Sequence, residues 1–319
     1  MPFCGIAGHA KSIATIRRIL GSGRIAHAYL LFGPEGIGKK KVAAAFIEAL
    51  FCGRDEGCGE CSSCRKIASG NHPDIHLLEP DGQFIKVDQV RALQKDLAYR
   101  PYEAARKACI IDGADRFNPS SGNSLLKTLE EPPGNALIIL LASTADAVLP
   151  TIRSRCQQIP FSGVPVGEIA GFLQGSDIDE GSARVAAALA DGSIARALNL
   201  CSVEIMAERS TVISTACNLS ANSMSDIFAF GELLDKDREK ALQALDILTS
   251  FWRDMLHLRS GSAEIVNSDL AALLEKETSR RSIELLLLGV ENLGKTRQAI
   301  LRNANVRLAM DVLSMQLAT

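Results

Sequence analysis

A glycine-rich loop near the N-terminus carries the residues best suited to chemistry. Gly33, Gly36, Gly38 and Lys39 fit the pattern G-x-x-x-x-G-K of a phosphate-binding loop, but Lys40 stands where serine or threonine is required. In a working loop the backbone N–H groups and the lysine hold phosphates, while the hydroxyl binds the bridging magnesium ion. A lysine ammonium about 4 Å from that cation would be repelled by roughly 8 kcal/mol at an effective dielectric constant of about 20. The sequence therefore predicts a loop that keeps its shape, binds phosphate residually at most, and has lost its magnesium chemistry.

Four clustered cysteines form a second candidate site. Cys52, Cys58, Cys61 and Cys64 follow the spacing C-x5-C-x2-C-x2-C, which brings four thiolates close enough to share one tetrahedral metal ion. Four ligands leave no open position for catalysis, so the spacing predicts a structural zinc site. The alternatives are disulfides, which the expected reducing compartment disfavours, redox thiols, and a chance clustering of cysteines. The other five cysteines are scattered and are predicted to be small buried hydrophobic side chains: Cys4, Cys109, Cys156, Cys201 and Cys217.

Composition limits the class of protein around these sites. At 319 residues the chain is long enough for two or three domains without disulfide bonds. Hydrophobic residues make up 47% of the chain and aromatic residues only 5%, which favours helical packing over a β-sandwich. The formal net charge of −2 argues against a chain that alone holds nucleic acid by neutralising phosphates. We find no membrane-spanning run and no signal peptide in the sequence, and expect a cytoplasmic protein.

The segments around the glycine-rich loop predict a parallel α/β sheet. An apolar run over 28–32 leads into the loop, and a helix is predicted from Val42 to Leu50, which completes the strand, loop and helix of a phosphate site. Further apolar runs over 108–111 and 136–141 predict two more buried strands. Continuous apolar strands that alternate with helices indicate a sheet with helices on both faces.

One acidic residue of a nucleotide hydrolase is present, but its usual neighbour is missing. Asp112 follows the predicted strand over 108–111, where a carboxylate would hold magnesium through water. In many such enzymes a glutamate comes next and polarises the attacking water, whereas here Gly113 follows. The hydrolytic apparatus thus lacks a second part, independently of Lys40.

The chain changes character near residue 165. Pro160, Gly163 and Pro165 mark a boundary, after which no strand-like run follows. Apolar residues at helical spacing over 238–258 indicate the core of a helical bundle. A C-terminal helical domain without a chemical motif more often serves assembly than catalysis. We expect three domains: a P-loop-like α/β domain over 1–165 with a zinc-binding insert at 52–64, a small helical domain over 166–207, and an all-α domain over 208–319.

Several segments together resemble one family. They are 23–30 before the loop, the four-cysteine insert, 125–133 with the sequence Leu-Leu-Lys-Thr-Leu-Glu-Glu-Pro-Pro, and 152–156 with the sequence Ile-Arg-Ser-Arg-Cys. This set is similar to the bacterial clamp-loader branch of the AAA+ ATPases over residues 8–165, and the helical remainder is similar in architecture only. The resemblance implies an α/β AAA+ module, a small helical lid domain, and an all-α C-terminal collar domain through which subunits oligomerise.

Within this branch, two kinds of subunit differ in the phosphate site. Gamma/tau subunits carry a complete P-loop and an Asp-Glu pair, whereas delta-prime subunits carry degraded versions, which Lys40 and Gly113 resemble. The sensor arginine of an active member would fall at Ala195, while Arg196 is displaced by one place and so rotated by about 100° on a helix. The resemblance therefore favours a delta-prime type, a component of the DNA-directed DNA polymerase III holoenzyme. No ATPase activity of its own is expected, and ATP binding is doubtful.

The resemblance also assigns a role to one arginine. The family's Ser-Arg-Cys motif falls on Ser154, Arg155 and Cys156, and there the arginine projects into the ATP site of a neighbouring subunit. A guanidinium supplied in trans is always charged and stabilises the transferring phosphoryl group. The implied partners are gamma/tau and delta subunits, with the sliding clamp and primer-template DNA reached through the complex. The alternatives are an active gamma/tau-like ATPase and a free-standing, zinc-containing nucleic-acid binder.

Overall fold

The chain forms two compact units. The computed structural model describes residues 3, 5–52, 54, 57–220, 223–234, 237–262 and 265–318. The first unit is Met1–Glu168 with Gly192–Ala195, and the second is Ile169–Asp191 with Arg196–Thr319. The three-domain division expected from the sequence, with boundaries at 165 and 207, stays a prediction.

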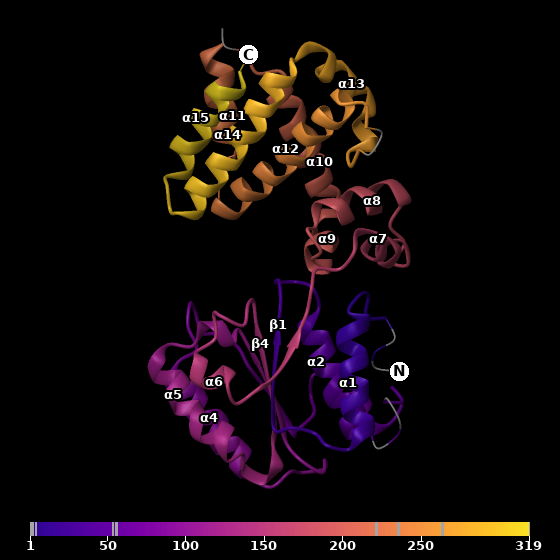
Figure 1. Ribbon diagram of the computed structural model, residues 1–319, viewed down its shortest axis with the longest axis vertical. Coiled ribbons are helices and arrows are strands. Elements are labelled where there is room, and N and C mark those ends of the chain that lie inside the picture. The colour runs from indigo at the N-terminus through magenta and orange to yellow at the C-terminus, as the bar shows by residue number, and fades with distance from the viewer. Residues whose placement is uncertain are drawn as a thin grey trace. The chain divides into compact units, whose positions relative to one another are not determined.

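A five-stranded parallel sheet lies at the centre of the first unit (Figure 1). Its strand order is β2-β3-β4-β1-β5, and all neighbouring strands pair in parallel. The predicted runs over 28–32, 108–111 and 136–141 form the three central strands, which confirms the parallel sheet. The strands are β1 (Ala28–Phe32), β2 (Ile75–Leu78), β3 (Ala108–Asp112), β4 (Leu137–Ala142) and β5 (Gln157–Pro160).

The two edge strands lack the continuous apolar run that marks the central three. Leu77 in β2 is half exposed, and β5 begins with the exposed residues Gln157 and Gln158. An edge strand has a neighbour on one side only, so it tolerates polar and exposed residues. For this reason β2 and β5 have no strand signal in the sequence.

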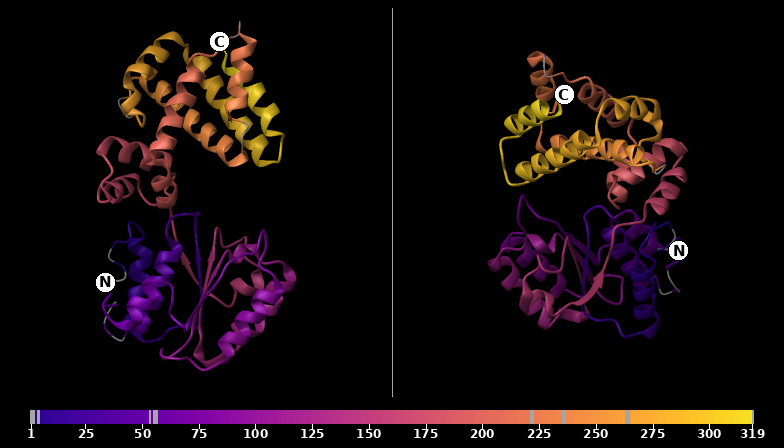
Figure 2. Two further views of the ribbon diagram at one scale, coloured as in Figure 1. Left: turned by 180° about the vertical axis from the view of Figure 1, so that it is seen from behind. Right: turned by 45° about the horizontal axis from the view of Figure 1, so that its top comes forward.

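Helices cover both faces of the sheet, as predicted (Figures 1 and 2). Successive residues of β1 enter opposite cores: Leu30 packs in the core that includes Leu125 of α5, and Leu31 packs in the core that includes Phe46 of α2. This alternation is the two-residue period of a strand buried on both sides. The helices are α1 (Ala10–Ser22), α2 (Lys39–Phe51), α3 (Ser62–Ala68), α4 (Val87–Ala98), α5 (Pro119–Glu130) and α6 (Pro150–Arg153), with the 3₁₀ turns η1 (Ala114–Arg116) and η2 (Pro133–Asn135).

The second unit consists of helices around a core of its own. The apolar stripe predicted over 238–258 lies in α12, and its residues Leu248, Phe251 and Trp252 are buried in that core, as expected. Helix α15 packs against α11 and α14, and α12 packs against α10, α13 and α14. The elements here are α7 (Val166–Gln174) and α9 (Ile194–Leu200), which both begin in the first unit, and α8 (Glu180–Leu189), α10 (Val203–Cys217), α11 (Met224–Leu234), α12 (Arg238–Arg259), η3 (Ser268–Leu270), α13 (Ala271–Arg280), α14 (Ile283–Leu301) and α15 (Val306–Leu317). Across the described ranges, no helix has both the length and the apolar character needed to cross a membrane.

Candidate functional site

The glycine-rich loop joins β1 to α2 and is packed closely by other parts of the first unit. A Cβ atom on Gly33 would lie 2.2 Å from the carbonyl oxygen of Phe161, and one on Gly36 would lie 2.2 Å from the hydroxyl of Ser193. Gly36 also has a φ of 72°, in the left-handed region that favours glycine. Close packing and backbone conformation therefore require these glycines, whether or not the loop holds a phosphate.

Lys39, the lysine of the phosphate-binding pattern, turns back onto its own loop. Its Nζ atom donates hydrogen bonds to the carbonyl oxygens of Gly33 and Pro34, at 2.5 and 2.6 Å. The residue is buried, and this burial lowers the pKa of Lys39 against the opposing field of Asp112 and Glu35. Two loop carbonyls thus take the N–H groups that a phosphate-binding lysine gives to its ligand.

Lys40 lies between two carboxylates at the C-terminal ends of neighbouring strands. Its Nζ atom is 2.5 Å from Oε1 of Glu79, directly after β2, and 3.7 Å from Oδ2 of Asp112, at the end of β3. Oxygen ligands of this kind are what magnesium binds in nucleotide hydrolases. Here an ammonium group supplies the positive charge among them. The sequence predicted that Lys40 offers no metal ligand, but it did not predict the partner Glu79, because β2 was missed.

The backbone after Asp112 is shaped for glycine. Gly113 has a φ of 84°, and a Cβ atom there would lie 3.0 Å from Cγ of Pro80. A glutamate at this position would be strained and would crowd the proline. The acidic pair thus lacks its glutamate, and the backbone at Gly113 disfavours a glutamate at this position.

Two further segments of the first unit hold the carbonyl groups of the loop. The N–H group of Ala195 donates to the carbonyl oxygen of Gly36 at 3.0 Å. Nε2 of His9 lies 2.7 Å from the carbonyl oxygen of Ile37, within hydrogen-bonding distance. The loop conformation is thus supported by protein contacts at Gly36 and Ile37.

Arg196, the displaced sensor candidate, forms an ion pair in the second unit. Its Nη2 atom donates to Oδ2 of Asp246 in α12 at 2.5 Å, and Nε of Arg297 donates to the other carboxylate oxygen at 3.0 Å. Asp246 therefore binds two arginines from α9 and α14. This pairing gives Arg196 a structural role within the helical unit.

Arg155 lies in the turn between α6 and β5, on the surface of the first unit. Its Nε atom donates to Oε1 of Glu130 at 2.8 Å, and Nη2 is 2.5 Å from the same oxygen. Nη1 donates to the carbonyl oxygen of Thr151 at 2.9 Å. The side chain is 36% exposed. The guanidinium is thus held in one orientation while it stays accessible from outside.

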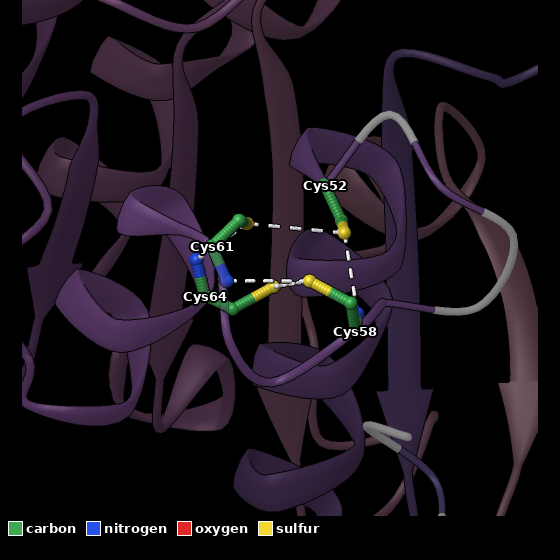
Figure 3. Close-up of side chains that lie close together, drawn as sticks. All are labelled: Cys52, Cys58, Cys61 and Cys64. Carbon is green, nitrogen blue, oxygen red and sulfur yellow. Dashed lines mark hydrogen bonds between the residues drawn. The ribbon is translucent and has the colours of Figure 1, made fainter.

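The four clustered cysteines converge at the end of α2 and the start of α3 (Figure 3). Their Sγ atoms all lie within 4.8 Å of one another. Cys58 and Cys64 are 4.0 Å apart at Sγ, and Cys61 and Cys52 are 3.9 Å apart. Four sulfur atoms placed tetrahedrally at 2.3 Å from zinc would be about 3.8 Å apart, whereas a disulfide bond is about 2.05 Å long. The separations therefore fit a metal centre and exclude disulfides among these four.

Backbone N–H groups point at these sulfur atoms. The N–H groups of Cys58, Cys61 and Cys64 donate to Sγ of Cys52, Cys58 and Cys61 at 3.2, 3.3 and 3.4 Å, respectively. Hydrogen bonds from Glu60 and Cys61 lower the pKa of Cys58 to about 6, while burial raises the pKa of Cys64. N–H donors favour the thiolate that a metal requires. The cluster can hold a metal ion, as the sequence predicted.

The remaining described cysteines lie apart from the cluster. Cys109 and Cys217 are buried, which confirms their prediction as small hydrophobic side chains, and Cys156 and Cys201 are half-buried. Burial raises the pKa of Cys156, next to Arg155, to about 12, so this thiol stays uncharged. Cys4 lies outside the described residues.

Three residues of the site were missed from the sequence. Glu79 pairs with Lys40, Glu130 pairs with Arg155, and Ser193 packs against the glycine-rich loop. Glu130 lies in the segment 125–133 that resembles the clamp-loader family, but nothing else in the sequence indicates that it pairs with Arg155. Glu79 follows an unrecognised edge strand, and Ser193 comes from a segment distant in sequence.

The P-loop-like turn on a parallel sheet, followed by helical segments, defines an AAA+ module. In its loop, Lys39 donates hydrogen bonds to backbone carbonyl groups and Lys40 pairs with Glu79. Comparison with protein families agrees with this class. The family described as "DNA polymerase III, delta subunit" matches residues 8–165, and the family "DNA polymerase III, delta subunit, C terminal" matches residues 204–317. The two models together cover most of the chain, which therefore belongs to a family of DNA polymerase III subunits.

Individual relatives support this assignment. DNA polymerase III subunit delta' of Bacillus subtilis is 31% identical over 304 residues, which cover 92% of this chain and 91% of that protein. The delta' subunit of Pseudomonas aeruginosa is 41% identical over 143 residues, 43% of this chain and 44% of that protein. Subunit tau of Bacillus subtilis is 30% identical over 266 residues, 79% of this chain but 47% of tau. Similarity to the first delta' subunit thus extends over nearly the whole chain, and the chain belongs to the delta-prime family of DNA polymerase III clamp-loader subunits, which act in DNA replication.

Proposed function

We propose that this chain is a non-hydrolysing, delta-prime-like subunit that assembles with gamma/tau and delta subunits in the cytoplasm. It supplies Arg155 to the ATP site of a neighbour, and the complex loads the sliding clamp on primed DNA. The observation that carries the proposal is the ammonium group of Lys40 between Glu79 and Asp112. It supports a helper role, because a subunit whose magnesium position holds a cation of its own contributes to hydrolysis only through a neighbour.

The contacts of both loop lysines support the loss of hydrolysis. Magnesium would have to displace the Lys40 ammonium from Glu79, and phosphates would have to draw Lys39 from the carbonyl groups of Gly33 and Pro34. A divalent ion about 4 Å from an ammonium is repelled by roughly 8 kcal/mol at an effective dielectric constant of about 20, the order of a micromolar binding energy. The exposed side chain of Lys40 can move away, so this figure is an upper bound. Residual binding at Gly33, Gly36, Gly38 and Lys39 would then be weak and independent of magnesium.

Arg155 supports a contribution in trans. An arginine finger needs a guanidinium that is accessible to a neighbour and charged at all pH values of interest. The side chain of Arg155 is partly exposed, so a neighbour can reach it. Its guanidinium stays protonated throughout this pH range. Its own chain needs no bound ATP for this role.

Exposed apolar side chains support assembly through the C-terminal helices. Leu308, Val312 and Met315 on α15 are 65%, 44% and 46% exposed and recur at helical spacing, and Ile283 and Leu287 on α14 are 42% and 56% exposed. Helices α14 and α15 pack against each other, so these residues lie on neighbouring elements. Exposed apolar groups of this kind are typical of protein interfaces. We propose that gamma/tau or delta subunits cover them.

We further propose that the metal at the four cysteines is zinc. All four donors are sulfur, and sulfur sets of this kind select zinc among the common divalent ions in tetrahedral geometry. Four protein ligands leave no position for water or substrate. The ion would therefore hold Cys52 at the end of α2 against the start of α3 and would take no part in chemistry.

A gamma/tau-like active ATPase is the second candidate function. The 30% identity with tau and the intact Lys39 favour it. Another oxygen ligand would then have to hold magnesium in place of the side chain at position 40. Magnesium-dependent ATP turnover by the purified chain alone would establish this function and exclude the first.

Replacing Lys40 by threonine is expected to return a magnesium ligand to the loop. The hydroxyl would lie near Glu79 and Asp112, whose negative charge would no longer be balanced by an ammonium. We expect magnesium to tighten binding of a non-hydrolysable ATP analogue to Lys40→Thr by about tenfold or more, and to have little effect on the unchanged chain. Calorimetric titration with and without magnesium measures this, with Lys41→Thr as the matched control. Equally strong magnesium-dependent binding by the unchanged chain would contradict the proposed loss of metal chemistry.

A further inference from the structure

The guanidinium of Arg155 is held on several sides by its own chain. Nε and Nη2 both bond to Oε1 of Glu130, and Nη1 bonds to the carbonyl oxygen of Thr151 and lies 3.4 Å from Oγ of Ser154. Arginine has five N–H donors, and Nη2 carries two of them. Within the described contacts, one N–H on Nη2 therefore stays available while the rest of the group is fixed.

Helix stability does not explain the carboxylate of Glu130. It is the last residue of α5, where the C-terminal end of the helix dipole disfavours negative charge. Its side chain is 50% exposed, so its ion pair with Arg155 contributes little to folding. A carboxylate that costs the helix something and stabilises the fold little points to a role in holding the arginine.

We propose that Glu130 is the positioning residue for Arg155. Its carboxylate holds the guanidinium in one orientation before a neighbour arrives, so that the remaining N–H on Nη2 is available to a phosphate oxygen. A free arginine would lose many rotamers on engaging a phosphate, whereas one held beforehand loses few. This inference rests on the proposed function, because it needs Arg155 to act on the ATP of a partner.

The chemistry of the pair distinguishes orientation from charge. Glutamine in place of Glu130 keeps an oxygen that accepts from Nε and Nη2 but removes the negative charge. Alanine removes both. If orientation is the contribution, glutamine should preserve it and alanine should abolish it.

The test is ATP hydrolysis by the complex reconstituted from this chain with gamma/tau and delta subunits, the clamp and primed DNA. We expect Glu130→Ala to slow hydrolysis about tenfold at the one ATP site that Arg155 would face, measured in a single turnover, with ATP binding there little changed, as for a misplaced transition-state group. Glu130→Gln should stay within about threefold of the unchanged complex. The matched control is Glu131→Ala, which removes the same charge from the next, exposed residue and should have no effect. The melting temperature should be unchanged in all three variants.

A double-mutant cycle with Arg155→Ala separates this inference from the proposed function. In the Arg155→Ala background, Glu130→Ala should have no further effect, because there is no guanidinium left to orient. The role of Glu130 would be overturned if Glu130→Ala still slowed hydrolysis in the Arg155→Ala background. It would also be overturned if Glu130→Ala kept full activity while Arg155→Ala was impaired. Neither result would affect the proposed role of Arg155. An Arg155→Ala complex with unchanged hydrolysis would overturn both proposals together.

Discussion

Arg155→Ala is expected to slow ATP hydrolysis by about 10³-fold at the neighbouring site to which we propose that Arg155 contributes, with the complex still assembled. An arginine supplied in trans stabilises charge on the transferring phosphoryl group, and alanine offers neither charge nor N–H donors. The loss should not come from unfolding. The ion pair between Arg155 and Glu130 is exposed, and exposed pairs contribute about 0–1 kcal/mol to stability.

Single-turnover hydrolysis is the appropriate measurement for Arg155→Ala. A complex can hold several ATP sites, and only the one facing this chain should become slow, so the variant should lose part of the fast amplitude. Arg153→Ala is the matched control, because it removes the same charge two residues away, where Arg153 pairs with Asp146. Equal amplitudes for the unchanged chain and Arg155→Ala would leave this chain with a scaffold role only.

Cys58→Ser is expected to lower both the zinc content and the stability of the protein. Structural zinc binds zinc-finger peptides with about 10–16 kcal/mol, and binding of this kind is coupled to folding. The loss of one of four thiolates opens the coordination shell. It also removes the sulfur that accepts the N–H bond of Cys61. We expect the variant to purify with little zinc and to melt at a lower temperature, and a chelator to have the same effect on the unchanged protein.

Metal analysis and thermal unfolding of the full chain test the zinc site. Cys201→Ser is the control, because Cys201 is half-buried and lies outside the cluster. It should keep its zinc. Zinc binding releases protons from the thiols, so affinity should fall as the pH is lowered. Full zinc content in Cys58→Ser would exclude the four-cysteine site.

The central part of the fold could be predicted from the sequence because its signals are local. The three central strands are continuous apolar runs, and the glycine-rich loop and the cysteine spacing are contiguous patterns. The edge strands β2 and β5 carry exposed and polar residues, so no apolar run marks them. Missing β2 also hid Glu79, which the fold brings to Lys40 from 39 residues away in sequence.

The rest of the site depends on contacts that no local pattern encodes. The sequence predicted that Lys40 could not bind magnesium, but the carboxylates around it come from the ends of two parallel strands. Likewise, Ala195 reaches the glycine-rich loop through a backbone hydrogen bond to Gly36, which depends on chain path and not on side-chain type. The pairing of Arg155 with Glu130 arises in the same way, from the packing of α5 against α6, which ends two residues before Arg155.

A side-by-side comparison of Lys39→Met and Arg155→Ala in the reconstituted complex tests most directly whether this chain assists hydrolysis or performs it. Methionine keeps the apolar stem of Lys39 but loses the hydrogen bonds to Gly33 and Pro34, at a cost of about 1–3 kcal/mol, so complexes must be compared at equal assembly. We predict that hydrolysis persists in Lys39→Met and falls in Arg155→Ala. Hydrolysis that falls in Lys39→Met and persists in Arg155→Ala would contradict this and make the chain an ATPase in its own right.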